Sequence, residues 1–291
     1  MDIPNSVLKR IEEWAEEPIQ MLSHQHKGNS NTTAVIQLRS GLQYFVKYSF
    51  SPDVDMSLEV RGLQTIEQKG VIPTPVVRYC EKDLILMDYF VKGKIGYNFF
   101  YNFGAQLAKL HKESAITFGL SYDNYLGSTP QLNVAEGEEA LSWTSFFWNK
   151  RLLPQYRLIE QKGMTDRTFV GMFSKLEKVF PKILQPVESD APSLLHGDLW
   201  SGNYLTGEDG QAVLIDPAIY YGHREADLAM TSLFGGFDSD FYKGYDDTLP
   251  LSDDWENRQN IYKLYHMMNH MNIYGTAYRP QAIGLMSYYV Y

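Results

Sequence analysis

Residues Leu195-His196-Gly197-Asp198-Leu199-Trp200-Ser201-Gly202-Asn203 and Leu214-Ile215-Asp216-Pro217 are the two stretches that decide the fold. Asp198 and Asn203 lie five positions apart on a predicted loop, and Asp216 follows Asp198 by 18 positions at the end of a β-like run. Phosphoryl transfer needs one carboxylate that takes the proton of the attacking hydroxyl, and an amide plus a second carboxylate that hold Mg²⁺. Protein kinases use the same H-x-D-x-x-x-x-N spacing with a downstream Asp. The spacing therefore predicts a phosphotransferase, in which a hairpin brings Asn203 and Asp216 side by side.

A purely structural interpretation of these residues is weaker. Gly197-Asp198 and Asp216-Pro217 are dipeptides that often mark turns, and either one alone would be weak evidence. The joint spacing, with β-like residues before the second carboxylate, is much harder to obtain by accident. We therefore favour the functional interpretation.

The composition excludes several other classes of protein. Apolar residues make up 44 % and charged residues 21 % of the 291, which is typical of a globular chain with a sizeable core. The longest nearly uncharged apolar run, 84–91, is too short to span a bilayer, and the N-terminus has no secretory signal pattern. The net charge of −9 disfavours nucleic acid and anionic membranes as partners. Because the single cysteine, Cys80, fits a reducing compartment, we expect a cytoplasmic protein.

Hydrophobic periodicity divides the chain into two parts. After a first helix near Asn5, strand-like runs at 33–39, 44–49, 76–80 and 83–89 surround one helical pattern at 55–69. From Tyr97 onward apolar residues recur every three to four positions, interrupted by a short β-like passage at 204–215. We therefore expect an α+β protein with a small β-rich N-terminal lobe, residues 1–91, and a larger, mostly helical C-terminal lobe, residues 92–291.

Longer stretches of the sequence resemble a known family. Residues 196–203 and 216–230 closely resemble the fructosamine kinase (ketosamine-3-kinase) family, which belongs to the aminoglycoside-phosphotransferase-like group with a protein-kinase-like fold. The similarity extends over nearly the whole chain, through residues 44–47, 107–111, 118–120, 124–131, 146–152 and 258–275. It implies a bilobal protein-kinase-like fold.

The resemblance also implies roles for individual residues. Asp198 would be the catalytic base, and Asn203 and Asp216 would be the Mg²⁺ ligands. Lys47 corresponds to the family's ATP-binding lysine, and Glu59, 12 positions later on the predicted helix, is its natural ion-pair partner. His196 would support the catalytic loop, and Asp227 would hold the backbone of that loop.

Two further segments would bind the nucleotide. The strand leading into Asp88, Tyr89, Phe90 and Val91 corresponds to the hinge whose backbone groups meet the adenine. In the loop that covers the phosphates, Gly28 is kept, but Asn29 stands where the family usually has a second glycine. Asn tolerates left-handed backbone angles better than most residues, so the turn can survive the change.

A third set of residues is predicted to contact the substrate. Trp200 lies between the base and a metal ligand, and aromatic or histidine side chains follow in the two later segments that the resemblance covers. Packing in the core is the alternative explanation for Trp200 and His266, and a surface ion pair is the alternative for His223. These candidates are Trp200, Tyr220, His223, Tyr265 and His266.

The function that this resemblance implies is ATP- and Mg²⁺-dependent phosphorylation of the sugar 3-hydroxyl of ketosamines. Such ribulosamine or fructosamine adducts form on amines or proteins, and the phosphorylated adduct falls off, which implies protein repair. Two alternatives remain open at this point. One is a kinase for another small amino sugar or amino alcohol, and the other is a weakened, pseudokinase-like nucleotide-binding module, which the change at Asn29 suggests.

Overall fold

The computed structural model describes residues 3–27, 31–51 and 54–290. These residues form two compact units. The first contains residues 1–96 and 205–216, and the second contains residues 97–204 and 217–291. The first unit therefore ends at Gly96 rather than at Val91, and it includes a segment that the sequence pattern alone assigned to the C-terminal part.

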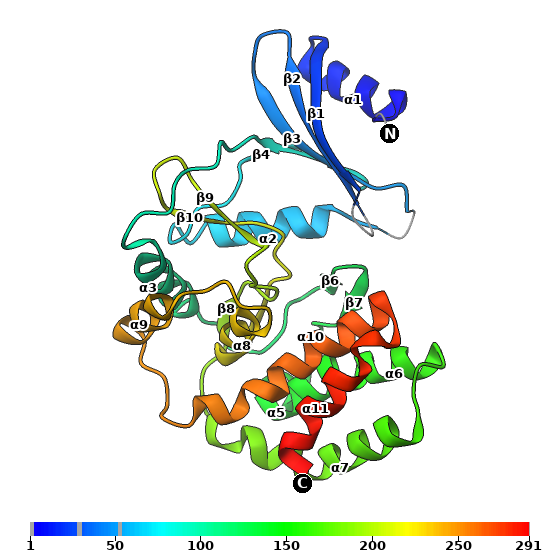
Figure 1. The fold of residues 1–291 in the computed structure, drawn as a ribbon, viewed down its shortest axis with the longest axis vertical. Helices are drawn as coiled ribbons and strands as arrows, with labels where there is room; N and C mark the ends of the chain where they lie inside the picture. Colours follow the sequence, from blue (N-terminus) through cyan, green and yellow to red (C-terminus); the bar gives the residue numbers. More distant parts are fainter. Residues whose placement is uncertain (1–2, 28–30, 52–53, 291) are drawn as a thin grey trace. The chain divides into compact units, whose positions relative to one another are not determined.

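The first unit is built on a five-stranded antiparallel sheet in the order β1-β2-β3-β5-β4 (Figure 1). Its strands are β1 (Ile19–Lys27), β2 (Thr32–Leu38), β3 (Gln43–Tyr48), β4 (Val77–Glu81) and β5 (Leu84–Asp88). The sequence pattern missed β1. Met21 and Leu22 on this strand are exposed, and its pairing with β2 is irregular at two places, so it lacks the apolar alternation of a half-buried strand.

Two helices cover the two faces of this sheet. Val7 and Ile11 of α1 (Asn5–Ala15) pack in one apolar cluster with Leu84 and Leu86 of β5. On the other face, α2 (Ser57–Glu67) packs in a second cluster with Ile85 and Met87. Because successive side chains of a strand point to opposite faces, the buried run of β5 supplies both clusters.

A hairpin from later in the chain completes the first unit. Its strands are β9 (Tyr204–Thr206) and β10 (Ala212–Leu214). The Gly93 N–H donates to the Thr206 carbonyl at 2.9 Å, and the Leu214 N–H donates to the Pro73 carbonyl at 3.0 Å. A Cβ at Gly93 would lie 1.9 Å from the Gly207 carbonyl oxygen, so this approach requires glycine.

The second unit is mostly helical, as the periodicity predicts. Its apolar core includes Phe169, Phe173, Leu176 and Phe180 from one face of α7. Two small antiparallel sheets pair β6 with β7 and β8 with β11. The elements are α3 (Phe99–His111), β6 (Asn124–Leu126), β7 (Thr129–Gln131), α4 (Gly137–Leu141), α5 (Trp143–Phe147), a π-helical turn (Trp148–Leu152), α6 (Leu153–Gln161), α7 (Arg167–Leu184), β8 (Ser193–Leu195), β11 (Tyr220–Gly222), α8 (Glu225–Leu233), α9 (Ser239–Thr248), α10 (Gln259–Tyr274) and α11 (Arg279–Val290).

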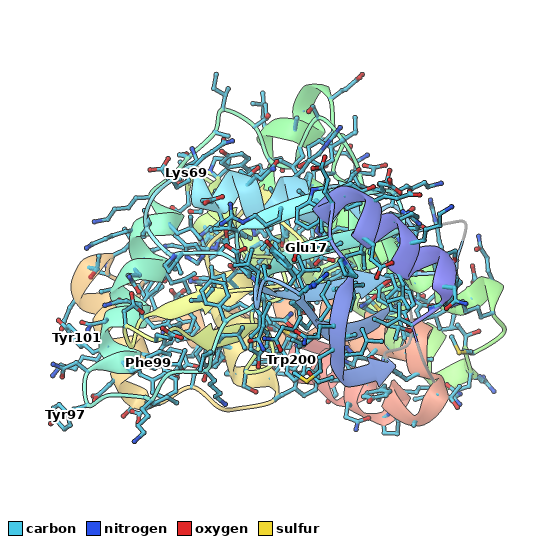
Figure 2. All side chains as sticks on the ribbon, turned by 90° about the horizontal axis from the view of Figure 1, so that it is seen from above. Glu17, Lys69, Tyr97, Phe99, Tyr101 and Trp200 are labelled. Carbon is cyan, nitrogen blue, oxygen red and sulfur yellow. The ribbon has the colours of Figure 1, made fainter. Side chains whose placement is uncertain are left out.

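Helices α3 and α9 pack at unusually short range. A Cβ at Gly104 of α3 would lie 1.9 Å from the Phe241 carbonyl oxygen, and a Cβ at Gly244 of α9 would lie 2.0 Å from the Tyr101 carbonyl oxygen. The Tyr101 hydroxyl, whose side chain is labelled in Figure 2, donates to Asp247 at 3.1 Å. Among the helices of the described ranges, none combines the length and the hydropathy that crossing a membrane requires.

Candidate active site

The loop between β8 and β9 is held by a buried carboxylate. The Asp227 side chain at the start of α8 accepts hydrogen bonds from the His196 N–H at 2.7 Å and the Gly197 N–H at 2.8 Å. Gly197 has φ +83°, and a Cβ there would lie 2.0 Å from the Ala218 carbonyl oxygen. The loop therefore requires both this glycine and an acceptor for two adjacent backbone donors.

The charge of Asp227 is maintained by its surroundings. Burial alone would raise the pKa of Asp227, but hydrogen bonds, led by the one with His111, hold that pKa below its usual value. His111 Nε2 lies 3.2 Å from the carboxylate, and burial lowers the pKa of His111, so the imidazole is neutral at pH 7. Asp227 is thus an ionised acceptor in the interior, as the expected support for the loop requires.

This arrangement fixes Asp198 relative to Asn203. The Asn203 Nδ2 group donates to the Asp198 carbonyl oxygen at 2.8 Å and to Asp198 Oδ2 at 3.1 Å. The Asn203 N–H also donates to the Trp200 carbonyl at 2.9 Å. Because its NH₂ group is committed to Asp198, the Asn203 amide oxygen points away from that carboxylate, as a metal-binding oxygen would.

The second set of predicted residues meets inside the first unit. Lys47 lies on β3 opposite Ile85, on the sheet face that α2 covers, and Glu59 lies in the first turn of α2. Lys47 Nζ donates to Glu59 Oε2 at 2.7 Å and to Asp216 Oδ1 at 3.1 Å. The ion pair expected from the spacing of Lys47 and Glu59 is therefore present, and Asp216 shares the same ammonium group.

Electrostatics keeps this ammonium group charged. Burial would lower the pKa of Lys47, but the Asp216 and Glu59 carboxylates outweigh burial and raise that pKa. Burial raises the pKa of Glu59, against the opposing effect of Lys47. Asp216 adopts φ 52°, a left-handed conformation that is uncommon outside glycine and is found at many functional sites.

The predicted adenine hinge follows β5 directly. The Asp88 side chain accepts hydrogen bonds from Arg78 at 2.8 and 2.7 Å, so this carboxylate ties β5 to β4. Tyr89 and Val91 are exposed, and Phe90 is half-buried. Gly28 and Asn29 of the predicted phosphate loop lie outside the described residues.

The structure separates the five substrate candidates into two groups. Trp200, labelled in Figure 2, is 37 % exposed and makes an edge contact with Phe234. His266 is buried, and its Nδ1 lies 3.7 Å from Asp198 Oδ1. Both residues therefore adjoin Asp198, the predicted base. Trp200 is two positions away in the chain, and His266 approaches it through space.

Internal contacts account for the other three candidates, Tyr220, Tyr265 and His223. The Arg151 guanidinium lies 3.9 Å from the centre of the Tyr220 ring, and the Tyr265 hydroxyl donates to Gln131 at 2.9 Å. His223 is buried and lies 3.0 Å from Asp190. A contact of these three side chains with substrate stays a prediction.

Sequence reasoning missed the buried Arg151 altogether. Its guanidinium donates to the Leu132 carbonyl and to Asn133 Oδ1, and it stacks on Tyr220 in the segment that follows Asp216. A basic residue in a helical region gives no local signal that it will be fully buried.

Comparison with known proteins assigns the family. The sequence model of the family described as fructosamine kinase matches residues 4–290. The chain belongs to the fructosamine kinase family. Its kinase-like α+β fold, which the sequence predicted, is confirmed by a structural neighbour: the structure of a candidate fructosamine-3-kinase from Thermobifida fusca is 29 % identical, with a TM-score of 0.85 over 98 % of this chain and 99 % of that one.

Sequence relatives carry related descriptions. A candidate ketoamine kinase of Enterococcus faecium is 36 % identical over 250 residues, which cover 84 % of this chain and 86 % of the relative. A chloroplastic protein-ribulosamine 3-kinase of Oryza sativa is 38 % identical over 189 residues, which cover 64 % of this chain and 53 % of that protein.

Proposed function

We propose that this protein is an ATP-dependent kinase that phosphorylates the sugar 3-hydroxyl of ketosamines, meaning ribulosamine or fructosamine adducts on amines or proteins. The observation that carries the proposal is the loop around Asp198. The Asp198 carboxylate is fixed by Asn203, and the backbone of the loop is held by Asp227. The chain around this loop matches the fructosamine kinase family over residues 4–290. The descriptions of the relatives as ketoamine and ribulosamine kinases support this substrate class.

In the proposed reaction, Asp198 accepts the proton of the sugar 3-hydroxyl as that oxygen attacks the γ-phosphorus of ATP. The bond between the γ-phosphorus and the β,γ-bridging oxygen breaks, and ADP leaves. Lys47, held charged by Glu59 and Asp216, would bind the α- and β-phosphates. In the proposed division of labour, residues 1–91 are the nucleotide-binding lobe and residues 92–291 the catalytic and substrate-binding lobe.

Asn203 and Asp216 are proposed to hold Mg²⁺, which would neutralise charge on the phosphates. The donor set fits that ion, because Mg²⁺ prefers oxygen ligands and takes only one or two carboxylates beside phosphate oxygens and water. Across the described ranges, no three Asp, Glu, His or Cys side chains gather into a metal site of their own. Such a sparse protein ligand set is consistent with a metal that arrives with the nucleotide.

Trp200 is proposed to recognise the substrate through its ammonium group. A ketosamine carries a secondary ammonium beside its hydroxylated chain, whereas a free sugar carries none. An ammonium over an aromatic face gains roughly 0.5–2 kcal/mol. Because the half-exposed Trp200 ring lies two positions from the base, it would favour the adduct over the free sugar.

The consequence of this activity would be repair of glycated proteins, since the phosphorylated adduct becomes unstable and leaves the amine. The cytoplasmic location expected from the sequence, and the absence of nucleic acid and membrane among the partners, stay predictions.

The proposal is tested by measuring phosphate transfer from ATP to ribulose-lysine, fructose-lysine, free ribose and free fructose. We expect kcat/KM to be at least about tenfold higher for the adducts, and Trp200→Ala to raise KM for the adducts selectively. Equal kcat/KM for a free sugar and its lysine adduct would instead indicate a kinase for other small amino sugars or alcohols. No phosphate transfer to any acceptor, with ATP still bound, would indicate the pseudokinase-like module.

A further inference from the structure

His266 is a buried histidine on α10 with one unused nitrogen. The residue is 4 % exposed, and its Nδ1 atom has no hydrogen-bond partner within the part of the chain that the structure describes. That atom faces the proposed catalytic base, with Nδ1 3.7 Å from Asp198 Oδ1. Burying a polar atom without a hydrogen-bond partner costs stability, so the position of Nδ1 beside Asp198 needs an explanation.

The buried surroundings of the His266 imidazole keep it neutral. The Tyr265 ring makes an edge contact with it at 5.2 Å, and the His266 carbonyl oxygen accepts a hydrogen bond from His270 Nδ1 at 2.8 Å. Burial lowers the pKa of His266 to about 3, with smaller contributions from His270 and Arg151 and an opposing one from Asp227. At neutral pH the ring is therefore a neutral donor and acceptor rather than a cation.

A neutral imidazole beside a carboxylate has a preferred tautomer. The carboxylate is an acceptor, so a proton on Nδ1 gives an attractive N–H···O⁻ contact, whereas a lone pair on Nδ1 would repel the oxygen. The separation of 3.7 Å is longer than a hydrogen bond, but catalytic hydrogen bonds are often long before substrate binds and shorten in the reactive complex.

We propose that His266 is a positioning residue for the catalytic base, whose Nδ1–H donates to Asp198 Oδ1 while Asn203 Nδ2 holds Oδ2. The two donors act on the two oxygens of one carboxylate and so fix its rotation. A fixed carboxylate keeps a lone pair directed at the attacking hydroxyl, and a misplacement of about 1 Å can cost roughly 10²-fold in rate. This assignment rests on the proposed kinase function, and it gives His266 a role on the base rather than on the substrate.

The kinetic test compares three substitutions at this position. His266→Leu and His266→Gln remove the donor at the Nδ1 position, whereas His266→Asn keeps an N–H donor near it. For the first two variants we expect roughly 10²-fold lower kcat, with little change in the KM for ATP or in the KM for the ketosamine. In His266→Asn we expect kcat to recover substantially.

Met267→Leu is the matched control, since it is a volume-conserving change at the next buried position of α10 and should leave kcat unchanged. Three kinetic results would overturn the assignment. They are a kcat within about twofold of wild type in His266→Leu, an equal loss in His266→Asn and His266→Leu, or an effect confined to the KM of the sugar acceptor. The last of these would make His266 a substrate contact.

A spectroscopic test needs no variant to fold. In the wild-type protein labelled with ¹⁵N-histidine, long-range ¹H–¹⁵N correlation spectra report which ring nitrogen of His266 carries the proton. We expect the Nδ1–H tautomer at pH 7, and an Nε2–H tautomer would contradict the assignment. If no ketosamine is phosphorylated by the wild type, the proposed function fails, whereas this measurement still tests the contact between His266 and Asp198.

Discussion

The orientation of Asp198 depends on one side chain close to it in the sequence, Asn203, and on one far from it, Asp227. Asn203 is five positions away, whereas Asp227, which holds the His196 and Gly197 N–H groups, is 31 and 30 positions from those residues. Because each contact restrains a different part of the loop, the carboxylate is held in place before substrate arrives. Such preorganisation is what a general base requires.

Asp198→Asn is expected to lower kcat by roughly 10²–10⁴ while leaving the KM for ATP nearly unchanged, since the amide cannot accept the hydroxyl proton. Steady-state kinetics with ribulose-lysine, with thermal unfolding as a check on folding, measures this. A kcat within a few-fold of wild type would remove Asp198 from the role of base.

Asp216→Ala tests the second of the two proposed Mg²⁺ ligands. We expect Mg²⁺-dependent turnover to fall by at least roughly 10²-fold. Without the Asp216 carboxylate, Mg²⁺ would be held less tightly beside the phosphates, whose charge it stabilises in the transition state. Asn203→Ala should raise the Mg²⁺ concentration needed for half-maximal rate. Glu208→Ala, an exposed acidic residue of the same hairpin, is the control and should behave as wild type. Normal turnover by Asp216→Ala in excess chelator would contradict the proposed ligands.

Among the helices, α3 and α9 each place a glycine against the backbone of the other helix. Gly104 and Gly244 let the helices approach until a single added methyl would meet a carbonyl oxygen. Short-range packing of this kind holds His111, at the end of α3, against Tyr245 of α9 and Asp227 of α8. The proposed catalytic loop therefore depends on this helix pair through His111 and Asp227.

Gly104→Ala is expected to destabilise the protein by about 1–3 kcal/mol or more, since its Cβ would lie 1.9 Å from the Phe241 oxygen and force the helices apart. The matched control is Gly171→Ala in α7, where a Cβ meets nothing within 4 Å. That change should stabilise the protein by roughly 0.5–1 kcal/mol, as alanine does in an open helical position. Urea unfolding of both variants measures the difference, and equal effects would contradict the packing described.

For the whole molecule, burial of histidines links stability to pH. Burial lowers the pKa values of His111, His266 and His270. A histidine with a lowered pKa in the folded state stabilises that state above its unfolded value of about 6.5, and this contribution is lost as the pH falls below it. The raised pKa of Glu59 has the opposite effect, but one carboxyl group offsets only one of the three histidines.

We therefore expect the free energy of unfolding to fall between pH 7 and pH 5. Each histidine contributes up to about 1.4 kcal/mol per pH unit to this slope. His266→Asn should reduce the slope by about that amount, because one buried imidazole is gone, while Met267→Leu should leave it unchanged. Urea unfolding at several pH values measures the slope, and parallel profiles for wild type and His266→Asn would contradict the burial of a neutral imidazole.

Features that depend on local spacing could be predicted from the sequence. The buried apolar run of β5 and the apolar stripe of α7 both follow from residues within a few positions of one another. The order of Asp198, Asn203 and Asp216, together with the longer stretches around them, was enough to indicate the family and the fold class.

Contacts between residues far apart in the sequence depend on how the chain packs in three dimensions. Lys47 and Asp216 are 169 positions apart, and residues 205–216 join the first unit through backbone hydrogen bonds that no side-chain pattern encodes. The edge strand β1 was missed because neighbouring backbone, rather than an apolar face, holds it. His266 faces Asp198 for the same general reason: a helical period predicts that a side chain is buried, but the packing of helix against loop selects the atom it meets.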